Sequence, residues 1–377
     1  MINESNLRIF ASEKSWIEGD AVQQLRYTLT LPGMVYGVGL PDLHPGKGHA
    51  IGAAFISVGN IYPFLVGSDI GCGIGLWTTG IKTSKVKRDK WGAKLVALEE
   101  QWDGDPAAWL AAHGVPTPTW ESSLGSIGAG NHFAELQMID KVEDTEVLES
   151  LGLSKDRLVL AVHSGSRGLG DWILRSHTSI HGAKGLEVIS AEATVYLGRH
   201  NDAMRWAAAN RALIAARILD IIGGDGDRVL DLCHNSVTQC TFDGGEGWLH
   251  RKGAAPSDQG PLLIPGSRGA YSYLVVPVGD QTSNAWSLAH GAGRKWNRSA
   301  IKARLKGQVS LDSLRQTKLG SLVICDNKDL LLEEAPEAYK NIDTVINDLA
   351  EPGLLKVVAR LKPVITYKTA DPDRDRG

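Results

Sequence analysis

The feature that most constrains the fold is the segment GSDIGCGIGL at residues 67–76, which holds four glycines in ten residues. Glycine at this density disfavours both a helix and an ordinary strand, so the segment predicts a tight loop. The apolar run IYPFLV at 61–66 precedes it and predicts a buried strand that ends in this loop. Such a loop would present Asp69 and Cys72 together.

The composition and the order of the patterns favour one globular unit. Of the 377 residues, 43% are hydrophobic and 22% are charged, and 43 are glycines. No repeat and no long polar linker divides the chain, so we expect a single domain over 1–377 with a polar tail at 369–377. Because helical and strand patterns do not alternate regularly, an α+β fold is expected.

Several elements can be predicted by residue range. Helical patterns cover 20–30, with Asp20 as its cap, 86–113, with a break near DGDP, and 191–222, which Gly223 and Gly224 stop. A further helical pattern follows His290 and runs to about Leu305. Strands are expected at 157–162, ending at His163, and at 229–233, ending at His234, and residues 44–80 predict short strands and turns.

The charge balance and the cysteines bound the class of protein. The net charge of −3 gives no argument for a nucleic-acid partner, although a local basic groove would be compatible with it. No signal peptide and no membrane span are apparent, so we expect a cytoplasmic protein without a membrane partner. The four cysteines then predict reduced thiols, with Cys240 and Cys325 as ordinary core or surface residues.

Five of the eleven histidines share one setting, a loop rich in glycine and other small residues. A lone histidine is usually structural, but five in one setting, together with Asp69 and Cys72, indicate a common site. Two of the five also follow strand-like apolar runs. The five are His44, His132, His163, His234 and His290.

The residue types of this group favour a metal. A set that mixes imidazole, carboxylate and thiolate suits a borderline divalent transition ion, and a thiolate can bridge two ions. No Cys-x-x-Cys pair is present, so a zinc ribbon is excluded, and no contiguous metal motif such as HExxH occurs.

Other glycine-rich motifs point to phosphate. IPGSRGAYSY places Ser267 and Ser272 among small residues, while HSGSRG and HGAGR pair a histidine with Arg167 and Arg294. Hydroxyls, guanidinium groups and exposed backbone N–H groups are common phosphate ligands. GSIGAGN at 125–131 lacks the spacing and context of a dinucleotide-binding fingerprint.

Taken together and in order, these motifs resemble the RtcB family of RNA ligases. The resemblance rests on PDLHPGKG, VGSDIGCG, LGSIGAGNHFAE, HSGSRG, CHN, HRKGA, IPGSRGAYSY and LAHGAGR. It runs from about residue 16 to Lys368, which is nearly the whole chain. It implies an RtcB-type single domain, with packed central β-sheets and a deep metal-lined cleft flanked by helices. It also implies a ligase, dependent on GTP and Mn²⁺, that joins RNA ending in a 3′-phosphate or 2′,3′-cyclic phosphate to RNA with a 5′-hydroxyl.

The resemblance also implies roles for individual residues. His290 would attack GTP and become guanylylated. One Mn²⁺ ion would take Asp69, Cys72 and His132, and a second would take Cys72, His163 and His234. The implied GTP contacts are Asn131, Glu135, Ser267, Ser272, His290, Gly291, Gly293 and Lys368, and the implied phosphate or RNA contacts are Arg167, Arg294, Asp42 and His44.

The chain also departs from the family pattern. The family commonly has methionine at the position of Arg268 and a different residue at Tyr271, and its usual C-terminal lysine corresponds here to Lys368, with nine residues after it. WIEGDAVQQL and the short segment between Cys72 and Gly125 are similar to a divergent branch found beside a release factor H homologue. That branch is associated with repair of cleaved ribosomal RNA.

Three alternatives stay open at this point. A tRNA splicing or repair ligase would use the same residues on another RNA. A metal-dependent phosphoesterase or cyclic phosphodiesterase would keep the metal ligands without needing His290. A non-catalytic RNA- or ribosome-binding protein would tolerate loss of Cys72. The sequence leaves the RNA substrate, an archease-type activator and the oligomeric state undetermined.

Overall fold

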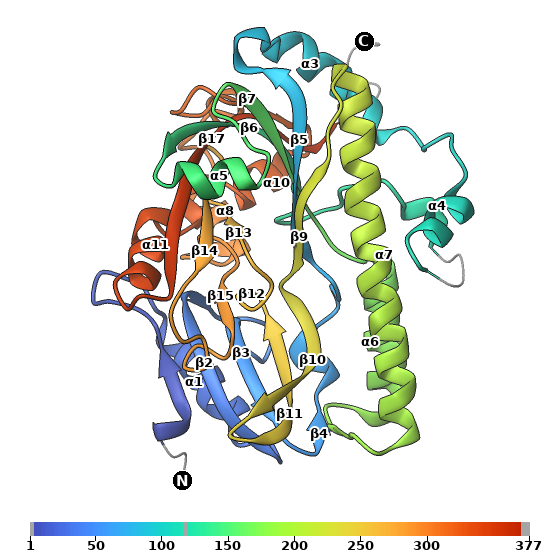
Figure 1. Ribbon diagram of the computed structural model, residues 1–377, viewed down its shortest axis with the longest axis vertical. Coiled ribbons are helices and arrows are strands. Elements are labelled where there is room, and N and C mark those ends of the chain that lie inside the picture. Colours follow the sequence, from blue (N-terminus) through green and yellow to red (C-terminus); the bar gives the residue numbers. More distant parts are fainter. Residues whose placement is uncertain (1–3, 116–119, 371–377) are drawn as a thin grey trace.

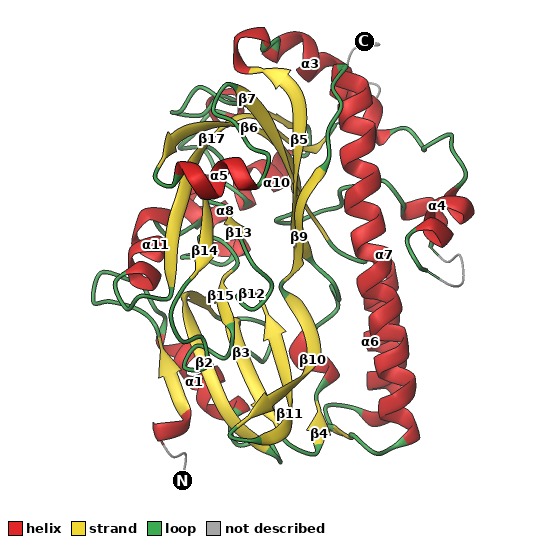
Figure 2. Cartoon of the chain, in the orientation of Figure 1, coloured by secondary structure: helices red, strands yellow, loops and turns green. Residues whose placement is uncertain are grey.

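Two sheets form the centre of the molecule and helices lie around them, so the α+β prediction is confirmed (Figure 1). The computed structural model describes residues 4–115 and 120–370. In the view of Figures 1 and 2 the larger sheet occupies the upper half and the smaller sheet the lower half. The candidate site residues lie where the edges of the two sheets meet.

Within the described residues, the larger sheet is antiparallel except at one pairing. Its order is β13-β14-β17-β6-β7-β5-β9, and β16 adds to β17 in parallel. The strands are β5 (Gly73–Lys82), β6 (Phe133–Val142), β7 (Arg157–Ser164), β9 (Arg228–Cys233), β13 (Leu262–Ile264), β14 (Ser272–Pro277), β16 (Leu322–Cys325) and β17 (Leu355–Thr369).

The smaller sheet has the order β1-β2-β3-β11-β10. A two-stranded pair, β12 with β15, links it to the site, and a second pair, β4 with β8, lies at its far end. The strands are β1 (Leu7–Ile9), β2 (Met34–His44), β3 (Ile51–Ser57), β4 (Asn60–Ile61), β8 (Leu186–Glu187), β10 (Asn235–Phe242), β11 (Gly245–Lys252), β12 (Ala254–Pro256) and β15 (Ser287–Ala289).

The longest helix, α7, spans Ala191–Ile222, which are the bounds predicted from sequence. The Ser190 side chain accepts a hydrogen bond from the Ala193 N–H at its start, and Gly223 ends it in the left-handed conformation at φ 72°. Its inner face packs Ile214 and Ile218 against the larger sheet. This packing places the middle of α7 behind the site.

The other helices are short. They are α1 (Gly19–Thr28), α2 (Pro63–Val66), α3 (Arg88–Lys94), α4 (Pro106–Ala112), α5 (Thr145–Ser150), α6 (Gly168–His181), α8 (Arg298–Leu305), α9 (Leu311–Arg315), α10 (Lys328–Glu333) and α11 (Ile342–Ala350). The break predicted near DGDP is confirmed, because it separates α3 and a following 3₁₀ turn from α4. The strands predicted at 157–162 and 229–233 are confirmed as β7 and β9.

The prediction for residues 61–76 is wrong in two respects. Pro63 begins the short helix α2 where a strand was expected, and the glycine-rich segment enters strand β5 at Gly73. A β-carbon on Gly73 would lie 2.3 Å from the Leu232 carbonyl oxygen, and one on Gly75 would lie 2.3 Å from the Trp77 ring. These glycines therefore allow close neighbours inside a sheet, and only residues 67–72 form the expected loop.

Two helix boundaries also differ from the predictions. Helix α1 begins at Gly19, so Asp20 lies in its first turn and is not the cap. The segment after His290 stays extended or turned until α8 starts at Arg298, where the Asn297 side chain accepts from the Ala300 N–H. Glycines at 291 and 293 keep the intervening segment out of a helix.

Two further predictions concern the tail and the membrane. Most of the predicted polar tail, from residue 371 onward, lies outside the described residues. None of the helices in the described part of the chain combines the length and apolar character needed to span a bilayer.

Candidate active site

Four predicted metal ligands lie at one edge of the larger sheet because of its strand order. Strands β6, β7, β5 and β9 are neighbours and antiparallel, so the starts of β6 and β5 lie beside the ends of β7 and β9. His132 precedes β6, Cys72 precedes β5, His163 lies near the end of β7 and His234 follows β9. Residues far apart in sequence are thus gathered by the ladder itself.

The ligand atoms of this group are close together. Cys72 Sγ lies 3.4 Å from His132 Nε2 and 3.2 Å from His163 Nε2, and the three residues form a buried group that could hold a metal ion. His163 Nε2 lies 3.3 Å from His234 Nε2, and His132 Nε2 lies 2.8 Å from Asp69 Oδ2. The cluster therefore extends from Asp69 at one end to His234 at the other.

The electrostatics of the cluster fit a cation. Burial lowers the pKa of His163 and of His234 well below the usual range, which keeps both imidazoles neutral and able to ligate. Burial, followed by the Asp69 charge, raises the pKa of the Cys72 thiol well above its usual range. A bound cation would offset that penalty, and the mix of sulfur, nitrogen and carboxylate suits a divalent transition ion.

His290 comes to the cluster from the other half of the molecule. It follows β15, whose partner strand β12 continues from the smaller sheet, and Asp42 lies near the end of β2. The buried Asp42 Oδ2 accepts from the His290 backbone N–H at 3.1 Å and lies 2.6 Å from His290 Nδ1. The His290 ring stands beside the His234 ring, with centroids 4.7 Å apart.

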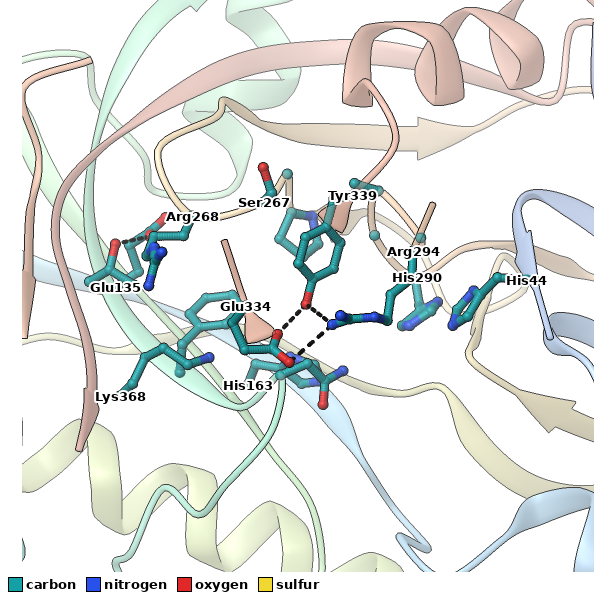
Figure 3. A pocket seen from close by; sticks show the side chains of 18 of the residues that line it. His44, Glu135, His163, Ser267, Arg268, His290, Arg294, Glu334, Tyr339 and Lys368 are labelled. Atoms are coloured by element: carbon teal, nitrogen blue, oxygen red, sulfur yellow. Dashed lines mark hydrogen bonds and ion pairs between the residues drawn. The ribbon is translucent and has the colours of Figure 1, made fainter. Parts of the chain in front are cut away.

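A pocket opens in front of His290 and the metal cluster (Figure 3). His163 is the member of the metal cluster that lines it. In Figure 3, His44 and His290 lie toward one end of the pocket and Glu135 and Lys368 toward the other. Its predicted lining residues are His44, Asn131, Glu135, His163, Ser267, His290, Gly291, Gly293, Arg294 and Lys368.

Glu135 belongs to a buried polar network at the far end of this pocket. Gln137 Nε2 donates to Glu135 Oε1 at 2.6 Å and to Ser272 Oγ at 2.9 Å, and Thr366 Oγ1 donates to Glu135 Oε2. Burial raises the pKa of Glu135 to about 7, with the hydrogen bonds opposing the shift. Ser272 is buried behind Gln137 and is not among the lining residues, so the structure does not bring it directly into the pocket.

Lys368 connects the pocket wall to the segment that carries the predicted metal ligand His132. It lies near the end of β17, beside the start of β6, and its Nζ donates to the His132 carbonyl oxygen at 3.0 Å. Burial is the main cause that lowers its pKa, while Glu334 acts in the opposite direction. Its side chain is thus buried in the pocket wall.

A cluster around Glu334 lines the pocket and was not predicted from the sequence. Arg294 Nη1 donates to Glu334 Oε1 at 3.1 Å, Arg298 Nε lies 3.5 Å from the same oxygen, and the Tyr339 hydroxyl donates to Oε2 (Figure 3). Arg294 also donates to the Glu333 and Trp296 carbonyl oxygens. Its guanidinium is therefore largely engaged by protein acceptors, and its role in phosphate binding stays a prediction.

Two further arginines, Arg268 and Arg167, lie in or near the pocket wall. Arg268 lines the pocket and donates through Nη2 to the Leu331 carbonyl oxygen, but its buried Nε and Nη1 have no partner among the described residues. Arg167 lies outside this pocket, in an adjoining hollow that Lys368 also lines. Its charge acts on Asp69, whose pKa stays below the usual value because His132 and Arg167 outweigh burial.

The comparisons with known proteins agree with this geometry. A model of the family described as tRNA-splicing ligase RtcB matches residues 24–105 and 110–369. An RNA-splicing ligase RtcB2 from Escherichia coli is 49% identical over 366 residues, which cover 96% of this chain and 95% of that protein. A tRNA-splicing ligase RtcB from Methanococcus maripaludis is 30% identical over 444 residues, which cover 93% of this chain and 92% of that protein.

The fold, the metal cluster and these matches define an enzyme of the RNA ligase class. The chain belongs to the RtcB family. The match covers the larger sheet, the smaller sheet except β1, and all four strands that carry the metal cluster, so the resemblance found in the sequence motifs extends to the whole candidate site.

Proposed function

We propose that this chain is a GTP- and Mn²⁺-dependent ligase that joins RNA with a 3′-phosphate or 2′,3′-cyclic phosphate end to RNA with a 5′-hydroxyl end. The observation that carries the proposal is the position of His290. Its ring is held by Asp42 and faces both the pocket and the metal cluster. A phosphoesterase would need the metal cluster but not a histidine held in this way.

The hydrogen bond to Asp42 decides which nitrogen of His290 is the nucleophile. A carboxylate oxygen accepts, so Nδ1 carries the proton and Nε2 keeps its lone pair. Nε2 would attack the α-phosphorus of GTP, forming a P–N bond as the bond to pyrophosphate breaks. The ring gains positive charge during this attack, and the Asp42 carboxylate stabilises that charge.

The metal cluster supports the same step. Cys72, His132 and His163, with Asp69 and His234 at the two ends, would hold two Mn²⁺ ions with the thiolate between them. When bound, such ions neutralise phosphate charge and align the reacting groups. The neutral state of His163 and His234 lets these two side chains ligate without losing a proton, whereas the Cys72 thiol would release its proton on ligation.

The remaining pocket residues would hold the nucleotide. Glu135 and Lys368 lie toward the end opposite His290, so they would contact the guanine base while the phosphates face His290 (Figure 3). Asn131, Ser267, Gly291 and Gly293 line the space between and offer amide, hydroxyl and backbone N–H donors.

Two further transfers would complete ligation. An oxygen of the RNA 3′-phosphate attacks the guanylate phosphorus, breaks the P–N bond to His290 and forms an RNA-3′-pp-G end. The 5′-hydroxyl then attacks the RNA 3′-phosphorus, the new phosphodiester forms and GMP leaves. A cyclic phosphate end must first be opened by water to the 3′-phosphate. His44, whose pKa burial lowers to about 4, stays neutral in the wall beside His290 throughout.

We propose that Lys252 contacts the RNA backbone near the 67–72 loop, which carries Asp69 and Cys72. It ends β11, its Nζ lies against Gly67, and the described residues provide it with no hydrogen bond or ion pair. Burial lowers its pKa to about 8, so it is largely charged at neutral pH. An unpaired ammonium group beside a metal site suits a phosphate.

The RNA substrate is proposed from the branch resemblance, and repair of cleaved ribosomal RNA is the first candidate. Joining of broken tRNA is the second candidate, and it is favoured by the archaeal relatives, which are named tRNA-splicing ligases. An archease-type activator and a functional link to a release factor homologue belong to the same proposal. Ligation of nicked ribosomal RNA and of split tRNA halves, measured side by side, separates the two candidates.

The decisive experiment is incubation of the full chain with labelled GTP and Mn²⁺. We expect an acid-labile protein–GMP adduct that the His290→Ala variant does not form. The matched control is His113→Ala, because His113 is a half-buried histidine outside the pocket. Absence of an adduct in the wild type, or an adduct that survives His290→Ala, would refute the ligase mechanism. The metal-dependent phosphoesterase would then be the favoured hypothesis.

A further inference from the structure

Arg211 is a fully buried cation in the middle of α7, directly behind the metal cluster. Its Nε and Nη2 donate to the two carboxylate oxygens of Asp231 on β9, at 2.5 and 3.0 Å. Arginine is rarely fully buried unless it is paired. Asp231 therefore fixes the plane and the direction of the guanidinium group.

The remaining donors of Arg211 reach three separate segments of the chain. Nη1 donates to the carbonyl oxygens of Gly71 and Ser164, both at 2.8 Å. Nη2 lies 3.4 Å from Cys233 Sγ. One rigid planar group thus holds the start of β5, the end of β7 and the end of β9 together.

Each acceptor is the chain neighbour of a predicted metal ligand. Gly71 precedes Cys72, Ser164 follows His163, and Cys233 precedes His234. Gly71 belongs to the 67–72 loop, which carries Asp69 as well as Cys72, but the described hydrogen bonds of Arg211 include none to the segment that carries His132. The arginine therefore contacts all three ligand segments of the ion predicted at Cys72, His163 and His234, and only the shared loop of the other ion.

The sheet ladder explains why such a contact is needed. Gly73 pairs with Ser164 on one side and with Cys233 on the other, and these are the last pairs of the two ladders. Beyond them, single backbone hydrogen bonds replace the ladder: the His234 N–H donates to the Cys72 carbonyl oxygen at 2.8 Å, and the Ser166 N–H to the Ile70 carbonyl oxygen at 3.3 Å. Arg211 donates to the Gly71 and Ser164 carbonyl oxygens and lies beside Cys233 Sγ at the point where the ladder stops.

We propose that Arg211, oriented by Asp231, is a positioning residue that sets the spacing of Cys72, His163 and His234 around one metal ion. This inference rests on the proposed two-metal ligase site. It adds that the two ions are not equivalent, because the guanidinium group behind the sheet holds all three ligand segments of the ion at Cys72, His163 and His234 but only the shared 67–72 loop of the other ion.

Helix α7 offers a matched control for this proposal. Arg217, further along the same helix, donates to the carbonyl oxygens of Gly125, Ala97 and Glu100 at 2.9, 3.1 and 2.7 Å. It also joins separate segments, but none of its acceptors is the chain neighbour of a predicted ligand. Arg217→Met therefore reproduces the loss of an α7 clamp without touching the ligand segments.

The test is a Co²⁺ titration of the metal-free full chain, followed by the thiolate-to-cobalt charge-transfer band and by calorimetry. The wild type is expected to bind two equivalents with a sulfur band. In Arg211→Met and Asp231→Asn, one equivalent should bind at least about tenfold more weakly, while the other should be weakened clearly less. Arg211→Lys keeps the positive charge but not the planar guanidinium group, so its affinity for the weakened equivalent should lie between those of the wild type and Arg211→Met. Arg217→Met should bind both equivalents as the wild type does.

Each outcome has a separate meaning. A wild type without a sulfur band refutes the metal centre of the proposed function itself. A wild-type band with unchanged binding in both Arg211→Met and Asp231→Asn refutes the positioning role alone. Equal weakening of both equivalents, or equal weakening in Arg217→Met, would also refute it, since that pattern indicates general destabilisation. If Arg211→Met fails to fold, as judged by circular dichroism, Arg211→Lys and Asp231→Asn carry the same comparison.

Discussion

The contact between Asp42 and His290 gives the sharpest prediction. In Asp42→Asn the side chain keeps its size, and the amide oxygen can still accept from the His290 ring and backbone N–H groups. What is lost is the negative charge that stabilises the ring as Nε2 attacks. Hydrogen bonds to a charged group contribute about 1.5–3 kcal/mol, so adduct formation should slow by roughly 10- to 150-fold.

The assay is single-turnover formation of the protein–GMP adduct at saturating GTP and Mn²⁺. Asp348→Asn is the control, because Asp348 is a buried carboxylate on α11 that accepts hydrogen bonds from Ser12 and Ser15 away from the pocket. The control should react at the wild-type rate. An Asp42→Asn rate within twofold of the wild type would refute the reasoning, because the carboxylate would then contribute nothing to the attack.

Three further predictions follow from other parts of the site. Cys72→Ala should lose the sulfur-to-cobalt band and the adduct, while Cys240→Ala, a change in a thiol outside the cluster, should keep both in the same titration. Because burial raises the pKa of Glu135 to about 7, the folding stability of the wild type relative to Glu135→Gln should fall by up to about 3 kcal/mol as the pH rises from 4.5 to 8, as urea unfolding of both proteins at several pH values would measure. Lys252→Gln should lower the slope of log K against log salt for RNA binding by about 0.7 to 0.9, and the wild-type affinity should fall toward the variant's as the pH passes about 8; a slope that does not change would contradict the RNA contact.

The sequence was most informative where local chemistry decides the structure. Helix α7 could be bounded because Ser190 and Gly223 supply end signals that act within one turn. The motif loops could be recognised because glycine beside histidine or cysteine is unusual. The strand at Gly73 could not be predicted, since its glycines are accommodated by close neighbours on other strands that only the fold brings together.

The same distinction applies to the site. The metal cluster was accessible from sequence because its members stand in similar loops, but the partner of His290 was a matter of geometry between two sheets. Glu334 was missed because nothing in the sequence distinguishes it from the adjacent Glu333, and its arginine and tyrosine partners were not linked to it by any motif. Ser272 was assigned to the pocket by its motif, although its hydroxyl faces Gln137.

His234 explains how the two halves of the site are kept in register. It is the single residue between β9 of the larger sheet and β10 of the smaller sheet. Its backbone N–H donates to the Cys72 carbonyl oxygen at 2.8 Å, and its ring lies beside both His163 and His290. Any rotation of one sheet against the other must therefore change the backbone at His234. Because its ring stands between His163 of the metal cluster and the nucleophile His290, such a rotation would change the distance between them directly.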